Sequence, residues 1–343
     1  MDEKRIQILR DEAPLKAILS LSVPTILAMQ VQVFYNLTDT FFVGKLNDPF
    51  QVAAVSVAFP IFMILMSLSG IFGFGAASYI SRLLGKKDYL IAKKTSSIAF
   101  YTCIMASIVV TVLGLVFISP ILRLIGVTPE THGYAYDYLS IIFYGSIIVM
   151  LNFLLTLMIR SEGAAKVAMY GMFIGTGINI ILDPIFILVL GYGVKGAAIA
   201  TIIGQGVALL YYFDFYLRKK SMVSLHWKYF SFRSDILLEI LKVGIPASSY
   251  NIMINITNII GIYVAASYND MIVAAFGINR RIFSMCIMTL TGLAEGTQPL
   301  IGYSYGARKI ERMNKIIKTA LVMAAGVSFF FVLFFYLFAG KMI

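Results

Sequence analysis

Two aspartates and an asparagine lie inside apolar segments of the sequence, where they could bind a cation. Asp39 lies near the end of the apolar run 15–43, and Asp183 lies near the end of the run 167–190. Asn179 precedes Asp183 by four residues, so the two side chains would share one face of a helix. A charge in the middle of a bilayer costs roughly 2.5–3.5 kcal/mol on insertion scales, which makes each acid a candidate functional residue.

Two further polar residues should lie at the same depth, and a proline should add another ligand. Tyr138 and Thr201 follow the outer ends of the apolar runs 134–159 and 196–217 by about one helical turn. Pro184 has no amide hydrogen, so it should kink its helix and leave a backbone carbonyl free beside the neighbouring aspartate. Carboxylate, amide, hydroxyl and carbonyl oxygens suit a proton or Na⁺ and do not suit Zn²⁺. The predicted cation site consists of Asp39, Tyr138, Asn179, Asp183 and Thr201.

Either of two coupling ions is compatible with this site. Asp39, Asn179 and Asp183 could together coordinate Na⁺, whereas the two carboxylates alone could exchange protons. Two simpler interpretations remain open. The polar groups could serve only to hydrogen-bond neighbouring helices, and Asp39 could reach the outer interface of the membrane.

Glu295 is a third acid well inside an apolar run, on the inner side of the membrane midplane. It lies between Gly292 and Gly296, a pair of small residues that permits close approach of another helix. We assign Glu295 and Arg281 to a substrate cavity, in which the acid could meet a cationic substrate. The alternatives are an ion pair of Glu295 with Arg281 or Arg280, or an acid in a cavity that faces the cytoplasm.

The sequence lacks the residue patterns of an enzyme. Cys103 and Cys286 both fall in apolar runs without metal-ligand spacing, and His132 and His226 fall in loops on opposite sides of the membrane. The segment GYGVKG, residues 191–196, matches G-x-G-x-x-G, but it connects two apolar runs and follows no soluble β-strand. We therefore expect no enzymatic activity and no cofactor other than the coupling ion.

The elements that must position these residues are membrane-spanning helices. The chain has 343 residues, of which 59% are hydrophobic and only 13% charged, and its mean hydropathy is +0.87. A soluble domain could not cover so much apolar surface. The runs are apolar on every face rather than alternating as in β-barrels, so the fold class is all-α and polytopic. Nine runs are long enough to cross a bilayer: 15–43, 51–80, 95–119, 134–159, 167–190, 196–217, 240–266, 271–303 and 316–339.

The basic residues predict the orientation of these spans. Of the 28 lysines and arginines, 22 fall on one side of the membrane when the nine spans are drawn. Positive residues concentrate on the cytoplasmic side of membrane proteins, so the N-terminus should be cytoplasmic. The net charge of +11 therefore requires no nucleic-acid partner.

An internal repeat divides the chain into two parts. Pro24 and Pro246 head two similar segments that are separated by an even number of spans, so both copies should face the same way. We expect a six-helix N-terminal lobe at 1–217, a basic cytoplasmic linker at 218–239 and a three-helix C-terminal lobe at 240–343. Three further spans would complete the second copy, so we interpret the C-terminal lobe as truncated.

Several segments resemble the MATE family of multidrug and toxin extrusion antiporters. The similar segments are NLTDTFFVGKL (36–46), GAASYISRLLGKKD (75–88), INIILDPIFILVLGYGVKGAAIAT (178–201), GINRRIF (277–283) and GLAEGTQPLIGYSYGARK (292–309). The QPLIGYSYGA segment is similar to the bacterial multidrug-efflux subgroup. The resemblance covers nearly the whole chain.

The resemblance implies a monomer with two lobes around a central cavity in the bacterial cytoplasmic membrane. It further implies alternating access, in which a Na⁺ or H⁺ gradient drives export of small cationic amphiphiles across the lipid bilayer. The first-helix acid of the family maps onto Asp39, its fifth-helix asparagine and aspartate onto Asn179 and Asp183, and its sixth-helix threonine onto Thr201. Tyr138 resembles the fourth-helix tyrosine near that site.

Two departures from the family pattern and two alternative functions remain. The last three helices of the second lobe are missing, and Gly261 stands at the repeat counterpart of Asp39. A flippase for lipids or lipid-linked oligosaccharides is the nearest alternative, because Arg280 and Arg281 could meet a pyrophosphate. A channel is the second alternative, and it should conduct without titration of Asp183.

Overall fold

The structure is a computed structural model that describes residues 3–231, 233–268 and 270–342, with side chains left out at some positions within 255–282 and at 338–342. The described residues form helices joined by short turns and, between residues 217 and 234, by a longer segment, without a β-strand. The helices are α1 Glu3–Arg10, α2 Pro14–Gly44, α3 Pro49–Lys86, α4 Tyr89–Val116, α5 Ile118–Leu124, α6 Pro129–Tyr144, α7 Ser146–Ser161, α8 Ala165–Pro184, η1 Ile185–Val189, α9 Gly193–Leu217, η2 Trp227–Tyr229, α10 Ser234–Ala266, α11 Asp270–Gly306 and α12 Ile310–Met342. The all-α class predicted from composition is confirmed.

Local sequence signals set the ends of the long helices. The Asp48 side chain accepts a hydrogen bond from the amide of Phe50 at the start of α3, and Asp88 does the same for Ile91 in α4. Such N-cap acceptors satisfy amide groups that have no partner within the helix. Lys87 closes α3 in a left-handed conformation.

Most predicted spans correspond to single long helices. Six helices of the described chain, namely α2, α3, α4, α8 with η1, α9 and α12, are long and apolar enough to cross a membrane. The predicted span over 134–159 is broken, because α6 and α7 meet at Gly145 with a bend of 55°. A Cβ atom on Gly145 would lie 2.2 Å from the Ile202 side chain, so α9 packs directly against the bend. The pair counts as one bent span or as two short helices.

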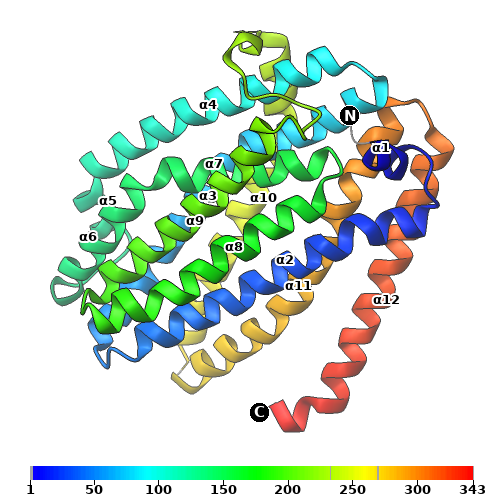
Figure 1. The fold of residues 1–343 in the computed structure, drawn as a ribbon. Helices are drawn as coiled ribbons and strands as arrows, with labels where there is room; N and C mark the ends of the chain where they lie inside the picture. Colours follow the sequence, from blue (N-terminus) through cyan, green and yellow to red (C-terminus); the bar gives the residue numbers. More distant parts are fainter. Residues whose placement is uncertain (1–2, 232, 269, 343) are drawn as a thin grey trace.

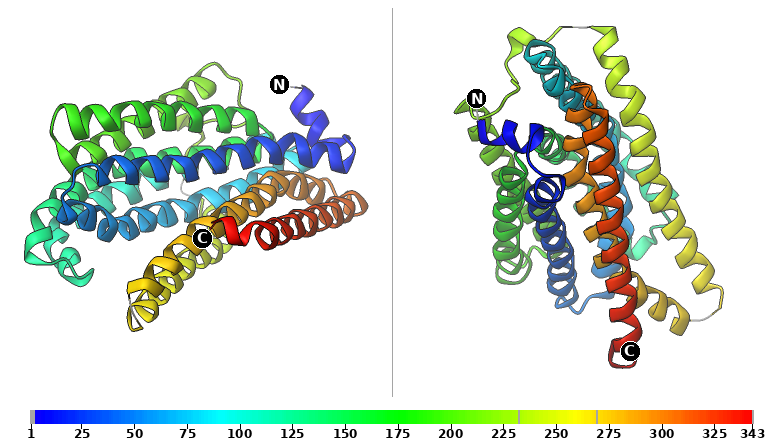
Figure 2. Two further views of the ribbon diagram at one scale, coloured as in Figure 1. Left: turned by 90° about the horizontal axis from the view of Figure 1, so that it is seen from below. Right: turned by 90° about the vertical axis from the view of Figure 1, so that its right-hand side faces the viewer.

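The long helices form one bundle in which the two sequence halves share a core. Figure 1 shows α9, α8 and α2 side by side, and α11 lies beyond α2. Both α10 and α11 pack against α3, and α12 lies at the edge of the bundle (Figure 2). Ile240 and Leu300 belong to the same buried cluster as Leu21. Side chains of α10, α11 and α12 therefore pack into one buried cluster with side chains of α2 and α3.

Glycines allow the closest contact between the halves, where α3 crosses α10. A Cβ atom on Gly75 of α3 would lie 2.0 Å from the carbonyl oxygen of Ile240 in α10. Reciprocally, a Cβ atom on Gly244 of α10 would lie 1.7 Å from the carbonyl oxygen of Ile71. Small residues at such crossings let two backbones touch, which is how membrane helices gain van der Waals contact without a hydrophobic effect.

Candidate cation site

The centre of the predicted cation site lies on α8, where Asn179 and Asp183 share one helix face. The Asn179 Nδ2 atom donates a hydrogen bond of 3.2 Å to the Asp183 Oδ1 atom. Asp183 is fully buried and Asn179 is 3% exposed. Close packing of α8 on α9 produces this burial, because a Cβ atom on Gly204 of α9 would lie 3.1 Å from the Asn179 Cβ atom. The i, i+4 spacing predicted from the sequence thus places both polar groups against α9.

Neighbouring helices bring the other predicted residues to the same place. Asp39 of α2 and Asp183 lie within range of mutual electrostatic interaction, and Tyr138 of α6 is within range of both carboxylates. Tyr138 and Thr201 are buried, with 6% and 5% of their surfaces exposed. The five residues chosen from spacing and depth therefore converge from α2, α6, α8 and α9.

Tyr35 is a member of this cluster that the sequence analysis missed. Its hydroxyl group lies 3.2 Å from the Thr201 Oγ1 atom and so joins α2 to α9. Tyr35 also interacts electrostatically with Asp39, Tyr138 and Asp183. Tyr35 lies four residues before Asp39 and therefore on the same helix face, and this spacing could have identified it from the sequence.

Three buried oxygen atoms of this cluster accept no hydrogen bond from the described residues. They are Asp39 Oδ1, Asn179 Oδ1 and Asp183 Oδ2. A buried acceptor without a partner is costly, and native structures rarely keep one without a bound ligand or a functional reason. A proton on a carboxylate, or a Na⁺ among the three oxygens, would satisfy them. The described residues contain no group of three or more His, Cys, Asp or Glu side chains that could hold a metal ion, so any Na⁺ would also use amide or hydroxyl oxygens.

Pro184 changes the helix immediately after Asp183. The α-helical pattern of α8 ends at Pro184, and η1 continues as a π-helix, in which the Leu190 amide donates to the Ile185 carbonyl over 2.8 Å. Turns of this kind are frequent at functional sites. The backbone pattern therefore changes beside the carboxylate, and both the kink and the free carbonyl stay predictions.

Glu295 forms an ion pair that the sequence analysis did not anticipate. Arg160 at the end of α7 donates to the Glu295 carboxylate of α11, and their side chains are only 6% and 20% exposed. The alternative pairing of Glu295 with Arg280 is not among the contacts of the described residues, in which Arg160 from a different helix is the partner. Arg280 is exposed, and the side chain of Arg281 lies outside the described residues, so its place in a substrate cavity is not tested.

The two glycines beside Glu295 have the role predicted for them. Cβ atoms on Gly292 and Gly296 would lie 2.8 and 2.4 Å from the Cα atoms of Ile26 and Ser22 in α2. The close approach of α11 to α2 is therefore confirmed.

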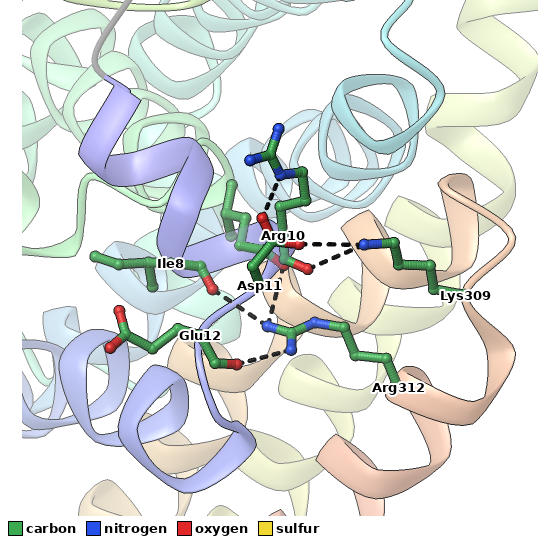
Figure 3. A network of polar contacts seen from close by, with 7 residues as sticks. Ile8, Arg10, Asp11, Glu12, Lys309 and Arg312 are labelled. Atoms are coloured by element: carbon green, nitrogen blue, oxygen red, sulfur yellow. Dashed lines mark hydrogen bonds and ion pairs between the residues drawn. The ribbon is translucent and has the colours of Figure 1, made fainter.

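A second polar network joins the two halves at the end of the bundle where α1 lies (Figure 3). Arg312 of α12 donates to the carbonyl oxygen of Glu12 over 2.7 Å and to that of Ile8 over 3.4 Å. Lys309 donates to the Arg10 carbonyl and to Asp11 Oδ1, both over 3.3 Å. A hydrogen bond from Arg10 and the charge of Lys309 lower the pKa of the Asp11 carboxyl group. We call this network the α1 clamp.

Comparison with known proteins identifies the class of protein that carries this site. The family model named MatE matches residues 24–185 and 246–343. The chain belongs to the MatE family. The resemblance seen in the sequence is confirmed, and with it the conclusion that the protein is a membrane transporter and not an enzyme.

Named relatives of this MatE protein are multidrug exporters. The Multidrug export protein MepA of Staphylococcus aureus is 35% identical over 329 residues, which are 96% of this chain and 72% of the relative. The protein of the same name from Staphylococcus saprophyticus is 34% identical over 322 residues, or 94% of this chain and 71% of the relative. These names do not favour the flippase alternative.

Solved MATE transporters have the same arrangement of helices. An outward-facing conformation of a multidrug resistance MATE family transporter of the MOP superfamily matches with a TM-score of 0.94 and 32% identity, over 99% of this chain and 75% of that one. A MOP superfamily transporter from Pyrococcus furiosus, described as having a binding pocket of reverse polarity, matches with a TM-score of 0.93 and 32% identity, over 99% and 75%.

Proposed function

We propose that this MatE protein exports cationic amphiphilic drugs or toxins in exchange for H⁺ or Na⁺ by alternating access. The observation that carries the proposal is the set of three buried oxygen atoms without donors on Asp39, Asn179 and Asp183. A buried carboxylate pair is a costly way to join helices but an effective way to bind and release a cation. The relatives named as multidrug exporters support the choice of cargo.

The helix α2 provides a path from the cation site to the opposite half of the bundle. Tyr35 and Asp39 of α2 face α8 and α9, whereas Gln30, further along α2, donates to the Met285 carbonyl and the Thr289 hydroxyl of α11 over 2.9 and 2.8 Å. A cation that binds better to one position of α2 would shift the protein toward that position. Movement of α2 would then alter the contact between the two halves. We propose that the substrate passes between these halves.

The two polar networks between the halves suggest which end must open. The Arg160–Glu295 ion pair and the α1 clamp both join the first half to the second near the end of the bundle that carries α1. Access from that side requires both to separate. The excess of basic residues in the same loops supports a cytoplasmic N-terminus in a bacterial cytoplasmic membrane, and we propose that one chain acts as a monomer.

Efflux of a cationic dye from proteoliposomes tests the proposal, with pH and Na⁺ gradients imposed separately. We expect one gradient to drive efflux by the unchanged protein and Asp183→Asn to abolish it. Asp214→Asn is the matched control, because Asp214 pairs with Arg218 at a half-exposed helix end, and it should retain efflux. Efflux by Asp183→Asn at the rate of the unchanged protein would remove the carboxylate from the mechanism.

The same measurement distinguishes the two ions. Efflux that follows only the Na⁺ gradient would assign Na⁺ to Asp39, Asn179 and Asp183, whereas efflux that follows only the pH gradient would assign proton exchange to the two carboxylates. Dye movement without either gradient, unchanged in Asp183→Asn, would instead support a channel.

A further inference from the structure

A large cavity of the described chain lies away from the cation site, at the end of the bundle that carries α1. It has a volume of about 1650 Å³. Its walls come from α1, the first turns of α2, the start of α4, the turn between α7 and α8, the end of α9 and the segment that follows α9. Figure 1 shows these helix ends around α1. The cavity therefore lies where the membrane-spanning helices leave the bilayer.

The cavity is strongly basic, and we call it the basic cavity. Seven of its lining residues are lysine or arginine and two are acidic. Both acids already have cationic partners, Glu12 with Lys16 and Asp214 with Arg218. Five lining lysines form no ion pair with an acid within the described chain: Lys4, Lys93, Lys166, Lys219 and Lys220.

Other contacts fix the walls of the basic cavity in place. Arg5 donates a hydrogen bond to the carbonyl oxygen of Lys220 and stacks over the Phe215 ring at 5.3 Å. The buried Glu162 carboxylate accepts a hydrogen bond of 3.0 Å from the Ser221 hydroxyl group. These contacts hold α1 and the segment after α9 around the cavity, so the lysines are gathered before any ligand binds. The rule that cytoplasmic loops are basic accounts for the number of lysines but not for their convergence on one cavity.

An apolar stripe leads from the basic cavity along α2. Leu19 and Val23 line the cavity, and with Leu15 and Leu27 they repeat every four residues along one face of the helix. These four side chains are between 43% and 53% exposed. A phospholipid has a charged headgroup at one end and hydrocarbon chains at the other. Its shape therefore matches a cationic cavity that continues into exposed apolar side chains on a spanning helix.

We propose that the basic cavity binds the headgroup of an anionic phospholipid from the leaflet on the α1 side, with acyl chains along the apolar stripe of α2. Basic pockets between spanning helices bind such headgroups, and each lysine near an anionic surface strengthens binding about fivefold. The ligand would hold α1, α2 and the end of α9 together. This site is separate from the cation site and does not depend on the nature of the coupling ion.

Native mass spectrometry of the purified protein tests the proposal. The probes are phosphatidylglycerol, phosphatidylcholine with the same acyl chains, and glycerol phosphate as a soluble phosphate. The test variant is Lys166→Gln/Lys219→Gln/Lys220→Gln. The control Lys86→Gln/Lys315→Gln/Lys318→Gln removes equal charge from the same side at positions outside the cavity. Circular dichroism and elution volume show whether each variant is folded.

We expect phosphatidylglycerol to bind the unchanged protein and the control more tightly than phosphatidylcholine does. The test variant should bind phosphatidylglycerol on the order of 100-fold more weakly and phosphatidylcholine without change. Equal loss in both triple variants, or no preference for phosphatidylglycerol, would overturn the proposal. Glycerol phosphate that binds as tightly as the lipid would assign the cavity to a soluble anion and would also overturn it. If the triple test variant does not fold, Lys166→Gln alone should lower affinity about fivefold.

Discussion

At the scale of single residues, replacement of the Tyr35 hydroxyl group tests whether this cluster is a cation site or only joins helices. It is the polar group of α2 that reaches Thr201 of α9, one turn before Asp39. A hydrogen bond of this kind contributes about 0.5–1.5 kcal/mol. Tyr35→Phe should therefore raise the Na⁺ or H⁺ concentration for half-maximal dye efflux about 2- to 10-fold. Tyr170→Phe, at an exposed position of α8, should leave it unchanged. An unchanged concentration in Tyr35→Phe would place the hydroxyl outside the site.

Glu162 gives a residue-scale prediction about pH. It lies between α7 and α8, outside the membrane-spanning segments, and burial raises its pKa from 4.5 to about 7 although Arg5 and the Met222 amide act in the opposite direction. The folded protein therefore holds this proton more tightly than the unfolded chain. The stabilisation is complete below about pH 4.5 and is lost as the pH rises through about 7.

The melting temperature measured from pH 4.5 to 8 checks this sign. Glu162→Gln keeps an acceptor for Ser221 and removes the titration, so its melting temperature should fall less over this interval than that of the unchanged protein. Identical pH profiles for the two proteins would show that Glu162 does not titrate in this range.

At the scale of the elements, the crossing of α3 and α10 depends on the absence of a side chain at Gly244. A Cβ atom there would lie 1.7 Å from the Ile71 carbonyl oxygen, so Gly244→Ala must push the helices apart. Overpacking of this kind costs about 1–3 kcal/mol. Gly326→Ala in α12 is the matched control, because nothing lies within 4 Å of its Cβ position. Thermal unfolding in detergent should show a lower melting temperature for Gly244→Ala and an unchanged one for Gly326→Ala. Equal melting temperatures of the two variants would contradict the close crossing.

At the scale of the whole molecule, the Arg160–Glu295 ion pair joins the two halves. Arg160→Met leaves the Glu295 carboxylate, whose side chain is 20% exposed, without its partner. Loss of a partner costs about 3–5 kcal/mol at fully buried sites. The double variant Arg160→Met/Glu295→Met removes both charges and should recover much of that stability. We expect a lower melting temperature for the single variant and partial recovery in the double variant.

The same variant tests whether the pair controls access from the α1 side. Ser304 of α11 is fully buried, and a cysteine placed there should react faster with a maleimide added on that side when Arg160 is replaced. The comparison requires a background without Cys103 and Cys286. If the cysteine is labelled at the same rate whether or not Arg160 is replaced, the ion pair only stabilises the protein and does not control access.

The sequence by itself determined the class of fold and brought together most residues of the candidate cation site. Hydropathy runs give the spans because the cost of leaving a peptide group in hydrocarbon is a local property of each segment. The four-residue helical repeat placed Asn179 and Asp183 on one face of a helix, and depth within a span placed Asp39 at the level of Asp183. Both signals follow from distance along a single helix.

Only the tertiary structure decided which helices those residues meet. Glu295 pairs with Arg160, which is 135 residues away in the chain, and neither residue has a local signal that names the other. Ile202 of α9 packs against the break at Gly145, and the basic cavity forms where helix ends from separate parts of the chain meet. Partner choice between helices depends on side-chain contact across the bundle, and neither hydropathy nor periodicity contains that information.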